Sequence, residues 1–418
     1  MKSFPQMASV DIKTRILAIL CLAQFGSILV WYNFAAVLPV LRGEWQLNND
    51  QAGTLLSVFQ LGYVAAVLFA GWLTDKIGGR LTFALCAIET GLAGIGFAFC
   101  ASDYHTAIVW RLLAGIGQGG LYIPGMQILS RWYPVKQRGM ALGVYTCSLV
   151  ASYAAAYLVT APLAAIFSWQ AAILWTSIWA IPSAVLVYLY IPEKSGALSA
   201  QIDPVAQPGV KPLAPIWKKR TVWFIILGYT GHMWELYAFN GWIGSFSTYT
   251  LQRHGFGGEA SLAYGGAIAS ACLLMGAVSP ALVGWLSDRQ GRCVTASVVL
   301  MLSGAGSLLF GWLSDASLWV FVSAGLLYSF FIVADSAIFK AGLTELVSPE
   351  QLGASLSLQS VIGFGITIIS PKLFGMVLDS YGWGWAFSLL GIGPIAGVLA
   401  MLRLKNFPES EAMAGGKR

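Results

Sequence analysis

The segment GWLTDKIGGR, residues 71–80, returns almost unchanged as GWLSDRQGR, residues 284–292. Each copy holds one acidic and two basic residues, in a chain of which only 10% is charged. A charged turn that recurs 213 residues later predicts that the chain consists of two related halves.

The composition explains why these charges stand out. Hydrophobic residues make up 57% of the chain, and the mean hydropathy is +0.71. A soluble protein usually carries about 25% charged residues. So few charges cannot cover an aqueous surface, so most of this chain must face lipid or other apolar helices. The composition therefore predicts a polytopic membrane protein.

Apolar windows of about 19 residues predict twelve membrane spans. Backbone groups cannot stay unpaired in hydrocarbon, so spans of this length must be helices. The predicted fold is an all-α integral membrane protein with twelve transmembrane helices. The spans lie near residues 15–40, 52–73, 81–101, 105–130, 139–163, 169–191, 222–249, 261–286, 294–313, 317–344, 353–378 and 384–404.

One long polar segment separates the spans into two sets of six. Residues 193–220 contain prolines, a glycine and a terminal basic cluster, which is typical of a linker. We therefore expect an N-terminal six-helix bundle at 1–192, a cytoplasmic linker at 193–220 and a C-terminal six-helix bundle at 221–418. Because six is an even number, the two pseudo-symmetric bundles should have the same orientation.

The positions of Lys and Arg predict the orientation in the membrane. If both termini are cytoplasmic, 19 of the 24 basic residues lie on that side, and only Arg42 and Arg253 lie on the opposite side. We expect a multi-pass protein of the inner cell membrane. The net charge of +6 is then a topology signal, and it gives no reason to expect a nucleic-acid partner.

The repeated turn is a candidate conformational gate. The glycine that opens each copy of the turn would let helices approach closely. The Asp of each copy sits at a helix end, where it can cap a helix or pair with a base. The turn glycines Gly78 and Gly291 would accept backbone conformations that other residues resist. A polar lock of this kind closes one side of the protein and must break to open it. The predicted gate residues are Gly71, Asp75, Arg80, Gly284, Asp288 and Arg292.

These motifs resemble those of a known family. The first turn is similar to the loop 2–3 signature of the major facilitator superfamily, and the second copy to its weaker echo in loop 8–9. RLLAGIGQGG, residues 111–120, resembles the fourth-helix Arg-x-x-x-Gly-x-Gly motif of the same superfamily. The resemblance covers essentially the whole chain. It implies two six-helix bundles that rock about a central cavity and open it to each side of the membrane in turn.

Arg111 is the leading candidate for substrate binding. It lies about two turns into its span, where a guanidinium can clamp a carboxylate with two parallel hydrogen bonds. The resemblance implies the same, since the fourth-helix Arg of the family is often tied to substrate binding or proton coupling. The alternatives are a structural ion pair with Glu89 in the preceding span or a cross-bundle pair with Asp335.

Four intramembrane groups are candidates for proton coupling, because ionisable groups at this depth are costly and usually mark a pathway or a pair. His232 and Glu235 lie in GHMWELYAFNGW, residues 231–242, three residues apart on one helical face. Asp335 and Glu89 complete the set. Glu235 has a structural alternative, which is to neutralise a neighbouring base. A metal site is not expected, since one His and one Glu do not supply the usual ligand count.

The remaining substrate-binding candidates are polar or aromatic residues at membrane depth, which need partners. Each of the uncharged ones can equally be explained as a contact between helices, and Lys372 can equally extend outward to the interface. Together with Arg111, the predicted set is Tyr32, Asn33, Gln60, Tyr63, Tyr145, Tyr237, Asn240, Gln359 and Lys372.

The favoured function is proton-coupled secondary transport of a small metabolite, with an organic anion preferred because three basic residues lie within the spans. Three acidic residues also lie within the spans, so a neutral or cationic substrate is an alternative. RWYPVKQRGMALG, residues 131–143, also resembles the RWFP-x-x-x-R-G segment of anion:cation symporters. One alternative is a proton/drug antiporter, although residues 142–162 lack the G-x-x-x-G-P-x-x-G-G signature of those proteins. A second alternative is a membrane receptor with a transporter fold and no transport.

The expected partners follow from this interpretation. They are a small-molecule substrate, protons and the lipid bilayer, and we expect the chain to act as a monomer. No cofactor is expected. No nucleophile–base set stands out that would indicate an enzyme, and the six cysteines form neither a CxxC pair nor a Cys/His cluster.

Overall fold

The computed structural model describes residues 11–192 and 218–417. The predicted linker at 193–220 therefore lies almost entirely outside the described residues. Within them, the structure is helical and contains no strand.

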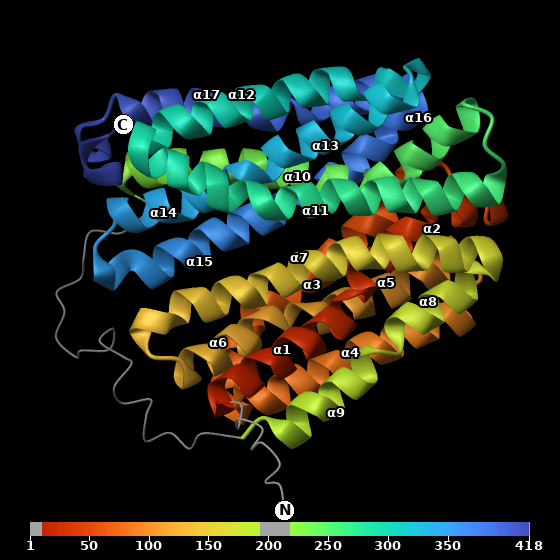
Figure 1. The fold of residues 1–418 in the computed structure, drawn as a ribbon, viewed down its shortest axis with the longest axis horizontal. Coiled ribbons are helices and arrows are strands. Elements are labelled where there is room, and N and C mark those ends of the chain that lie inside the picture. Colours follow the sequence, from red (N-terminus) through yellow and green to blue (C-terminus); the bar gives the residue numbers. More distant parts are fainter. Residues whose placement is uncertain (1–10, 193–217, 418) are drawn as a thin grey trace, which may run out of the picture.

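The first set of helices covers the chain up to residue 190, and Figure 1 shows these helices lying together in one half of the molecule. They are α1 (Ile12–Ile28), α2 (Val30–Glu44), α3 (Asn49–Ile77), α4 (Gly79–Cys100), α5 (Tyr104–Gly119), α6 (Tyr122–Trp132), α7 (Val135–Ile166), α8 (Trp169–Ser177) and α9 (Ala180–Tyr190).

The second set begins at residue 220 and lies alongside the first, with α11 next to α7 (Figure 1). Its elements are α10 (Arg220–Arg253), α11 (Gly258–Gln290), α12 (Arg292–Phe310), η3 (Leu313–Asp315), α13 (Leu318–Ala334), α14 (Ser336–Leu346), α15 (Pro349–Ile366), α16 (Ser370–Leu390), α17 (Ile392–Lys405) and η4 (Pro408–Gly416).

Nine helical stretches among the described residues are long and apolar enough to cross a membrane. The predicted spans near 105–130 and 222–249 are not among the nine. The first is divided between α5 and α6, and the second falls in α10, which carries buried polar groups. The predicted spans near 353–378 and 384–404 fall together in the single stretch of 55 residues from Gln351 to Lys405. The chain is thus a membrane-spanning helical protein.

Both copies of the repeated turn adopt the same backbone conformation, as predicted. Gly78 has φ 86° and ψ 151°, and Gly291 has φ 103° and ψ 145°. In each copy the glycine N–H donates to the carbonyl four residues earlier, Thr74 at 2.9 Å and Ser287 at 3.0 Å. Both turns lie at the end of the molecule where α1 begins and where η4 lies (Figure 1). We call this the near end, and the opposite end the far end.

We expect Gly78→Ala and Gly291→Ala each to destabilise the protein by about 1–3 kcal/mol, because a positive φ with an extended ψ strains any residue that has a Cβ. Thermal unfolding of the purified protein would measure this. Gly143→Ala in α7 is the matched control, since a Cβ there would meet no atom within 4 Å, and it should be neutral or slightly stabilising. Equal effects at all three positions would contradict the assigned turn conformation.

In this structure Gly71 and Gly284, the first glycines of the two turns, do not make the close helix contact that the sequence predicts. A Cβ added at Gly71 would meet no atom within 4 Å, and one at Gly284 would meet only the Ala337 Cβ at 3.7 Å. A Cβ at either position would thus enter open space or make ordinary van der Waals contact, so neither glycine supports a close helix contact in this structure. Gly139 and Gly353, also near this end, are similarly unobstructed.

Candidate functional site

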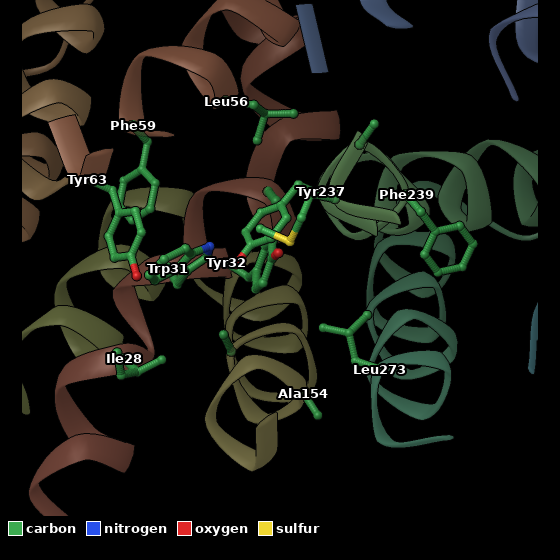
Figure 2. Packing of buried hydrophobic residues seen from close by; sticks show 14 of the residues in the cluster. Ile28, Trp31, Tyr32, Leu56, Phe59, Tyr63, Ala154, Tyr237, Phe239 and Leu273 are labelled. Atoms are coloured by element: carbon green, nitrogen blue, oxygen red, sulfur yellow. The ribbon is translucent and has the colours of Figure 1, made fainter. Parts of the chain in front are cut away.

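Six aromatic side chains from both sets of helices meet in the middle of the molecule. Trp31 packs against Tyr63 at 4.7 Å between ring centroids, and the Tyr63 ring lies 5.2 Å from that of Phe364 on α15. Figure 2 shows Trp31, Tyr32, Tyr63 and Tyr237 side by side. We call the following residues the central aromatic cluster: Trp31, Tyr32, Tyr63, Tyr153, Tyr237 and Phe364.

Several buried polar atoms at this cluster have no hydrogen-bond partner among the described residues. They include the Tyr32 hydroxyl, the Trp31 indole nitrogen and the Oε1 atom of Gln60, which lies one turn before Tyr63 on α3. The Asn240 side chain and the Trp31 indole both lie beside the Tyr32 hydroxyl. An unpaired buried polar group costs about 1–3 kcal/mol. The cluster is therefore suited to a ligand that supplies the missing polar partners.

Arg111 lies directly behind this cluster. Its side chain is only 3% exposed, and its guanidinium carbon sits 4.5 Å and 4.3 Å from the ring centroids of Phe34 and Phe59. Its Nε–H donates to the Leu55 carbonyl at 3.5 Å. The Phe59 ring is in turn 5.2 Å from Trp31. A cation that is so well shielded from water, and stacked on two rings, is costly unless an anion joins it.

Neither carboxylate considered as a partner of Arg111 pairs with it. Glu89 on α4 faces Gly117 of α5, and its Oε2 atom has no hydrogen-bond partner among the described residues. Asp335 instead contacts His232 in the second set of helices. Within residues 11–192 and 218–417, Arg111 makes no ion pair.

His232 and Asp335 form a buried pair at a break in the helix. Asp335 is the junction between α13 and α14, and its Oδ1 lies 2.8 Å from Nδ1 of His232. Both side chains are 2% exposed. The other ring nitrogen of His232 lies 3.0 Å from the Ser336 hydroxyl. The pair thus places an imidazole and a carboxylate in direct contact at the point where α13 ends and α14 begins.

Glu235 occupies a separate position on α10 with hydroxyl partners. Its Oε1 accepts hydrogen bonds from the Tyr328 hydroxyl at 2.9 Å and from the Ser307 hydroxyl at 3.1 Å. No Lys or Arg pairs with it among the described residues. The alternative that Glu235 neutralises a neighbouring base therefore concerns His232, which lies three residues earlier on α10 and interacts with it electrostatically.

Besides Arg111, Gln60 and Asn240, which lie next to the central aromatic cluster, four predicted substrate-binding residues are not part of it. Asn33 donates to the hydroxyls of Thr176 and Ser177 on or next to α8, at 3.0 and 3.1 Å. The other three make local contacts or face outward: Tyr145 stacks on Tyr122, Gln359 donates to the Phe339 carbonyl at 3.4 Å, and Lys372 is exposed.

The sequence reasoning missed Trp31, Tyr153 and Phe364 of the cluster, and it also missed Tyr328. Tyr153 and Tyr157 are four residues apart in one helix, which places two phenols on one face. That spacing was a usable signal for Tyr153. Trp31 and Phe364 carry no comparable signal, because one aromatic residue in an apolar span is most often packing.

At the far end, side chains of the two sets are in direct contact. The Asp379 carboxylate of α16 accepts from the Asn49 N–H at 2.9 Å, the Asn49 side-chain amide at 2.6 Å and the Asp50 N–H at 2.8 Å, at the start of α3. The Tyr157 hydroxyl donates to the Asn240 carbonyl at 2.6 Å. A Cβ at Gly375 would overlap the Asn49 carbonyl. The far end is therefore closed.

At the near end, the second copy of the gate motif forms its polar lock within one set of helices. Arg292 at the start of α12 pairs with Asp288 of α11 at 2.5 Å and with Glu345 of α14 at 2.9 Å. Glu345 also accepts from the Ala414 N–H in η4 at 3.1 Å. In the first copy, Asp75 is exposed, and the Arg80 guanidinium lies 5.0 Å from the Tyr188 ring centroid.

We expect Asp379→Asn to loosen the far end. The amide keeps one acceptor oxygen but presents an NH₂ group to a backbone N–H, and losing one charged hydrogen bond costs about 1.5–3 kcal/mol. Pulsed EPR distances between spin labels on Gly43→Cys and Gln252→Cys should shift to longer values. Asp315→Asn is the control, because its pair with Arg253 is exposed and worth at most about 1 kcal/mol. An unchanged distance distribution in Asp379→Asn would contradict the assigned role.

No group of three or more His, Cys, Asp or Glu side chains suited to a metal ion occurs in the described part of the chain. What the geometry provides is a buried polar–aromatic centre between two sets of membrane helices that are in direct contact at the far end. This arrangement defines a membrane transport protein.

The comparisons with known proteins identify the family. The sequence model of the Major Facilitator Superfamily matches residues 20–338 and 260–417, so the chain belongs to this superfamily. Its members and the relatives below are transporters and not enzymes.

Two curated relatives are similar over most of the chain. The chain is 24% identical to the hexuronate transporter of Bacillus subtilis over 379 residues, covering 87% of this chain and 88% of the relative. It is 26% identical to a probable sulfoacetate transporter of Cupriavidus necator over 417 residues, covering 92% and 93%.

A solved structure shares the fold. It is a bacterial homologue of the human lysosomal transporter Spinster in an inward-facing and unoccupied conformation. The TM-score is 0.71 at 17% identity, and the alignment covers 97% of this chain and 98% of that one.

Proposed function

We propose that the chain is a secondary active transporter that moves a small organic anion across the inner membrane by proton-coupled alternating access. The observation that carries the proposal is Arg111, a buried guanidinium without an ion-pair partner among the described residues, next to the central aromatic cluster. The named substrates of both curated relatives, a hexuronate and sulfoacetate, are organic anions.

The proposed architecture is two pseudo-symmetric bundles of six helices, at residues 1–192 and 221–418, joined by a cytoplasmic linker at 193–220. The equal conformations of Gly78 and Gly291 support the internal repeat. The count of twelve follows if the pairs α1–α2, α5–α6, α8–α9 and α13–α14 each cross the membrane once and the chain reverses at Gly382 within α16. α15 with the first part of α16, and the rest of α16 with α17, then make the last two crossings. Both termini are then cytoplasmic and the protein works as a monomer.

In this proposal the near end faces the cytoplasm, because the far end carries only Arg42 and Arg253 as basic residues. The contacts of Asp379 and Tyr157 close the outer side, while a Cβ at Gly71, Gly139 or Gly353 near the other end would meet no atom within 4 Å. The structure then represents an inward-facing state. The change to an outward-facing state requires the far-end contacts to break and the two sets of helices to come together at the near end.

The substrate carboxylate or sulfonate is proposed to bind Arg111, and its remaining polar groups to bind Tyr32, Gln60 and Asn240. No carboxylate of the described residues competes for the Arg111 guanidinium, so the anionic group of the substrate can form a charge-assisted hydrogen-bonded pair with it. The tyrosine rings supply the apolar walls. Asn33, Tyr145 and Gln359 are proposed to hold helices together, since their side chains already have partners or stack on a neighbour.

Proton coupling is proposed to reside in Glu235 and in the His232–Asp335 pair. Burial opposes a charge that lacks a partner, whereas hydroxyl donors stabilise a carboxylate. Glu235 therefore has a chemically reasonable charged and neutral form in the same pocket. Asp335 is at a helix junction, so a change of charge there acts on the helix geometry directly.

The experiment that tests the function is uptake into proteoliposomes with and without an imposed proton gradient, with glucuronate and sulfoacetate as substrates. We expect uptake of an acid that rises with the gradient. Uptake of neither acid would contradict the proposed substrate class, and uptake independent of the gradient would contradict the coupling. Drug efflux is less favoured because the named substrates of these relatives are metabolite anions.

A further inference from the structure

A cavity of about 370 Å³ lies at the far end, between the two sets of helices. Its walls come from α2 and α3 on one side and from α10 and α16 on the other, and they include Arg42, Asn49, Ser245, Tyr249, Gln252 and Trp383. This volume lies at the lower end of the range of about 300–1,000 Å³ that small-molecule sites occupy.

The cavity wall carries buried polar atoms that lack partners. The Ser245 side chain is only 3% exposed, and its hydroxyl has no hydrogen-bond partner among the described residues. The same holds for Nε of Arg42 and for Oδ1 of Asn49. A guanidinium, a hydroxyl and an amide side chain thus belong to residues that line one cavity, which is the composition expected of a site for a polar ligand.

The charges around the cavity leave Arg42 available to an anion. Arg253, the other basic residue predicted on this side, is paired with Asp315 at 2.6 Å. Asp379 interacts with Arg42 electrostatically, but its two oxygens accept three hydrogen bonds from Asn49 and Asp50.

The remaining acidic neighbour on α2 is also engaged. Glu44 accepts a hydrogen bond from the Trp169 indole at 2.8 Å. These hydrogen bonds come from neutral N–H groups and leave both carboxylates charged. Arg42 nevertheless makes no ion pair within the described part of the chain, so its guanidinium is the group in the cavity wall that can bind an anion.

This cavity shares no residue with the central aromatic cluster. The Tyr157–Asn240 hydrogen bond and the close approach of Gly375 to Asn49 are contacts between the two sets of helices near the far end. A ligand in the cavity would sit on the outer side of these contacts, while one at Arg111 would sit in the first set of helices, behind the cluster.

We propose that this cavity is a second anion site, an outer capture site for a small organic carboxylate or sulfonate. Arg42 binds the anionic group, Ser245 and Asn49 bind hydroxyl groups, and the rings of Tyr249 and Trp383 form the apolar walls. The proposal rests on the proposed function, because the same class of anion that is transported would be captured here while the outer side is closed. An anion bound in this outer cavity would then be close to the central site when the far end opens.

The test uses a reporter cysteine, Gln252→Cys, at the rim of the cavity, in intact cells treated with a membrane-impermeant maleimide. Modification of residue 252 is measured by peptide mass spectrometry, so the native cysteines do not interfere. Glucuronate and sulfoacetate are the probes. Glucose is the matched control, because it has the hydroxyl groups of glucuronate without the carboxylate.

We expect the acids, but not glucose, to slow the modification. Adding Arg42→Gln should raise the half-protecting concentration about 10- to 100-fold, as expected for the loss of a charge-assisted pair. Adding Arg42→Lys should restore part of the protection. Adding Arg111→Gln should leave the protection within about twofold, since Arg111 is not part of this cavity.

The proposal is overturned if neither acid protects residue 252, if glucose protects equally, or if Arg42→Gln leaves the protection unchanged. Uptake of the same acids in the same cells keeps the two proposals distinguishable. Uptake without protection removes the outer site and leaves the transport function. Protection without uptake supports the outer site and removes transport of these acids.

Discussion

Arg111→Gln is expected to weaken the binding of organic acids about 10- to 100-fold and to reduce their uptake accordingly. The guanidinium has no ion-pair partner among the described residues and rests on Phe34 and Phe59, so an arriving anion would form its first ion pair. A charge-assisted hydrogen bond is worth about 1.5–3 kcal/mol. Thermal-shift titration with glucuronate, sulfoacetate and glucose measures the effect directly.

The unliganded protein distinguishes a binding role from a structural one. If Arg111 serves the substrate, Arg111→Gln removes an uncompensated buried charge and the free protein should be no less stable. Arg111→Lys keeps the charge without the planar fork and should bind acids with intermediate affinity. Loss of stability without ligand, together with unchanged stabilisation by acids, would remove Arg111 from the substrate site.

Glu235→Gln is expected to abolish uptake driven by a pH gradient while leaving counterflow exchange intact. The amide is similar in size and can still accept from Tyr328 and Ser307, so the fold should be kept. It cannot bind or release a proton, so the substrate can still cross in both directions but the gradient no longer drives net accumulation.

The matched control is Glu259→Gln, since Glu259 is an exposed carboxylate in the first turn of α11. Both modes of transport should be normal in that variant. Gradient-driven accumulation that persists in Glu235→Gln would transfer the coupling role to His232 and Asp335 or to another group.

The parts of the fold that depend on local sequence were predictable. The positive φ of Gly78 and Gly291 follows from a glycine between two helices that reverse direction, and the structure has that conformation at both positions. The apolar spans were also predictable, because hydrocarbon permits few alternatives to a helix.

The parts of the fold and of the site that depend on which side of a helix faces its neighbours were not predictable from the sequence. Tyr32, Tyr63 and Tyr237 meet at the centre, whereas Asn33 and Tyr145 point to neighbouring helices. Hydropathy does not fix the rotation of a helix that is apolar on all sides.

The partners of the buried charged side chains also could not be predicted from the sequence. His232 binds Asp335 because the junction of α13 and α14 brings the carboxylate to α10, and no spacing along the chain encodes that contact. The roles of Gly71 and Gly284 depend on conformational state. In the present arrangement the near ends are apart, so these glycines touch almost nothing.

The hydrogen bond between Glu345 and the Ala414 N–H fastens η4 to α14, and Arg292 fastens α14 to α12. The end of the chain is thus mechanically coupled to a segment that begins at the His232–Asp335 pair. A fluorophore attached beyond residue 414 would follow the tilt of α14, which offers an optical readout of turnover that leaves the substrate pathway unmodified.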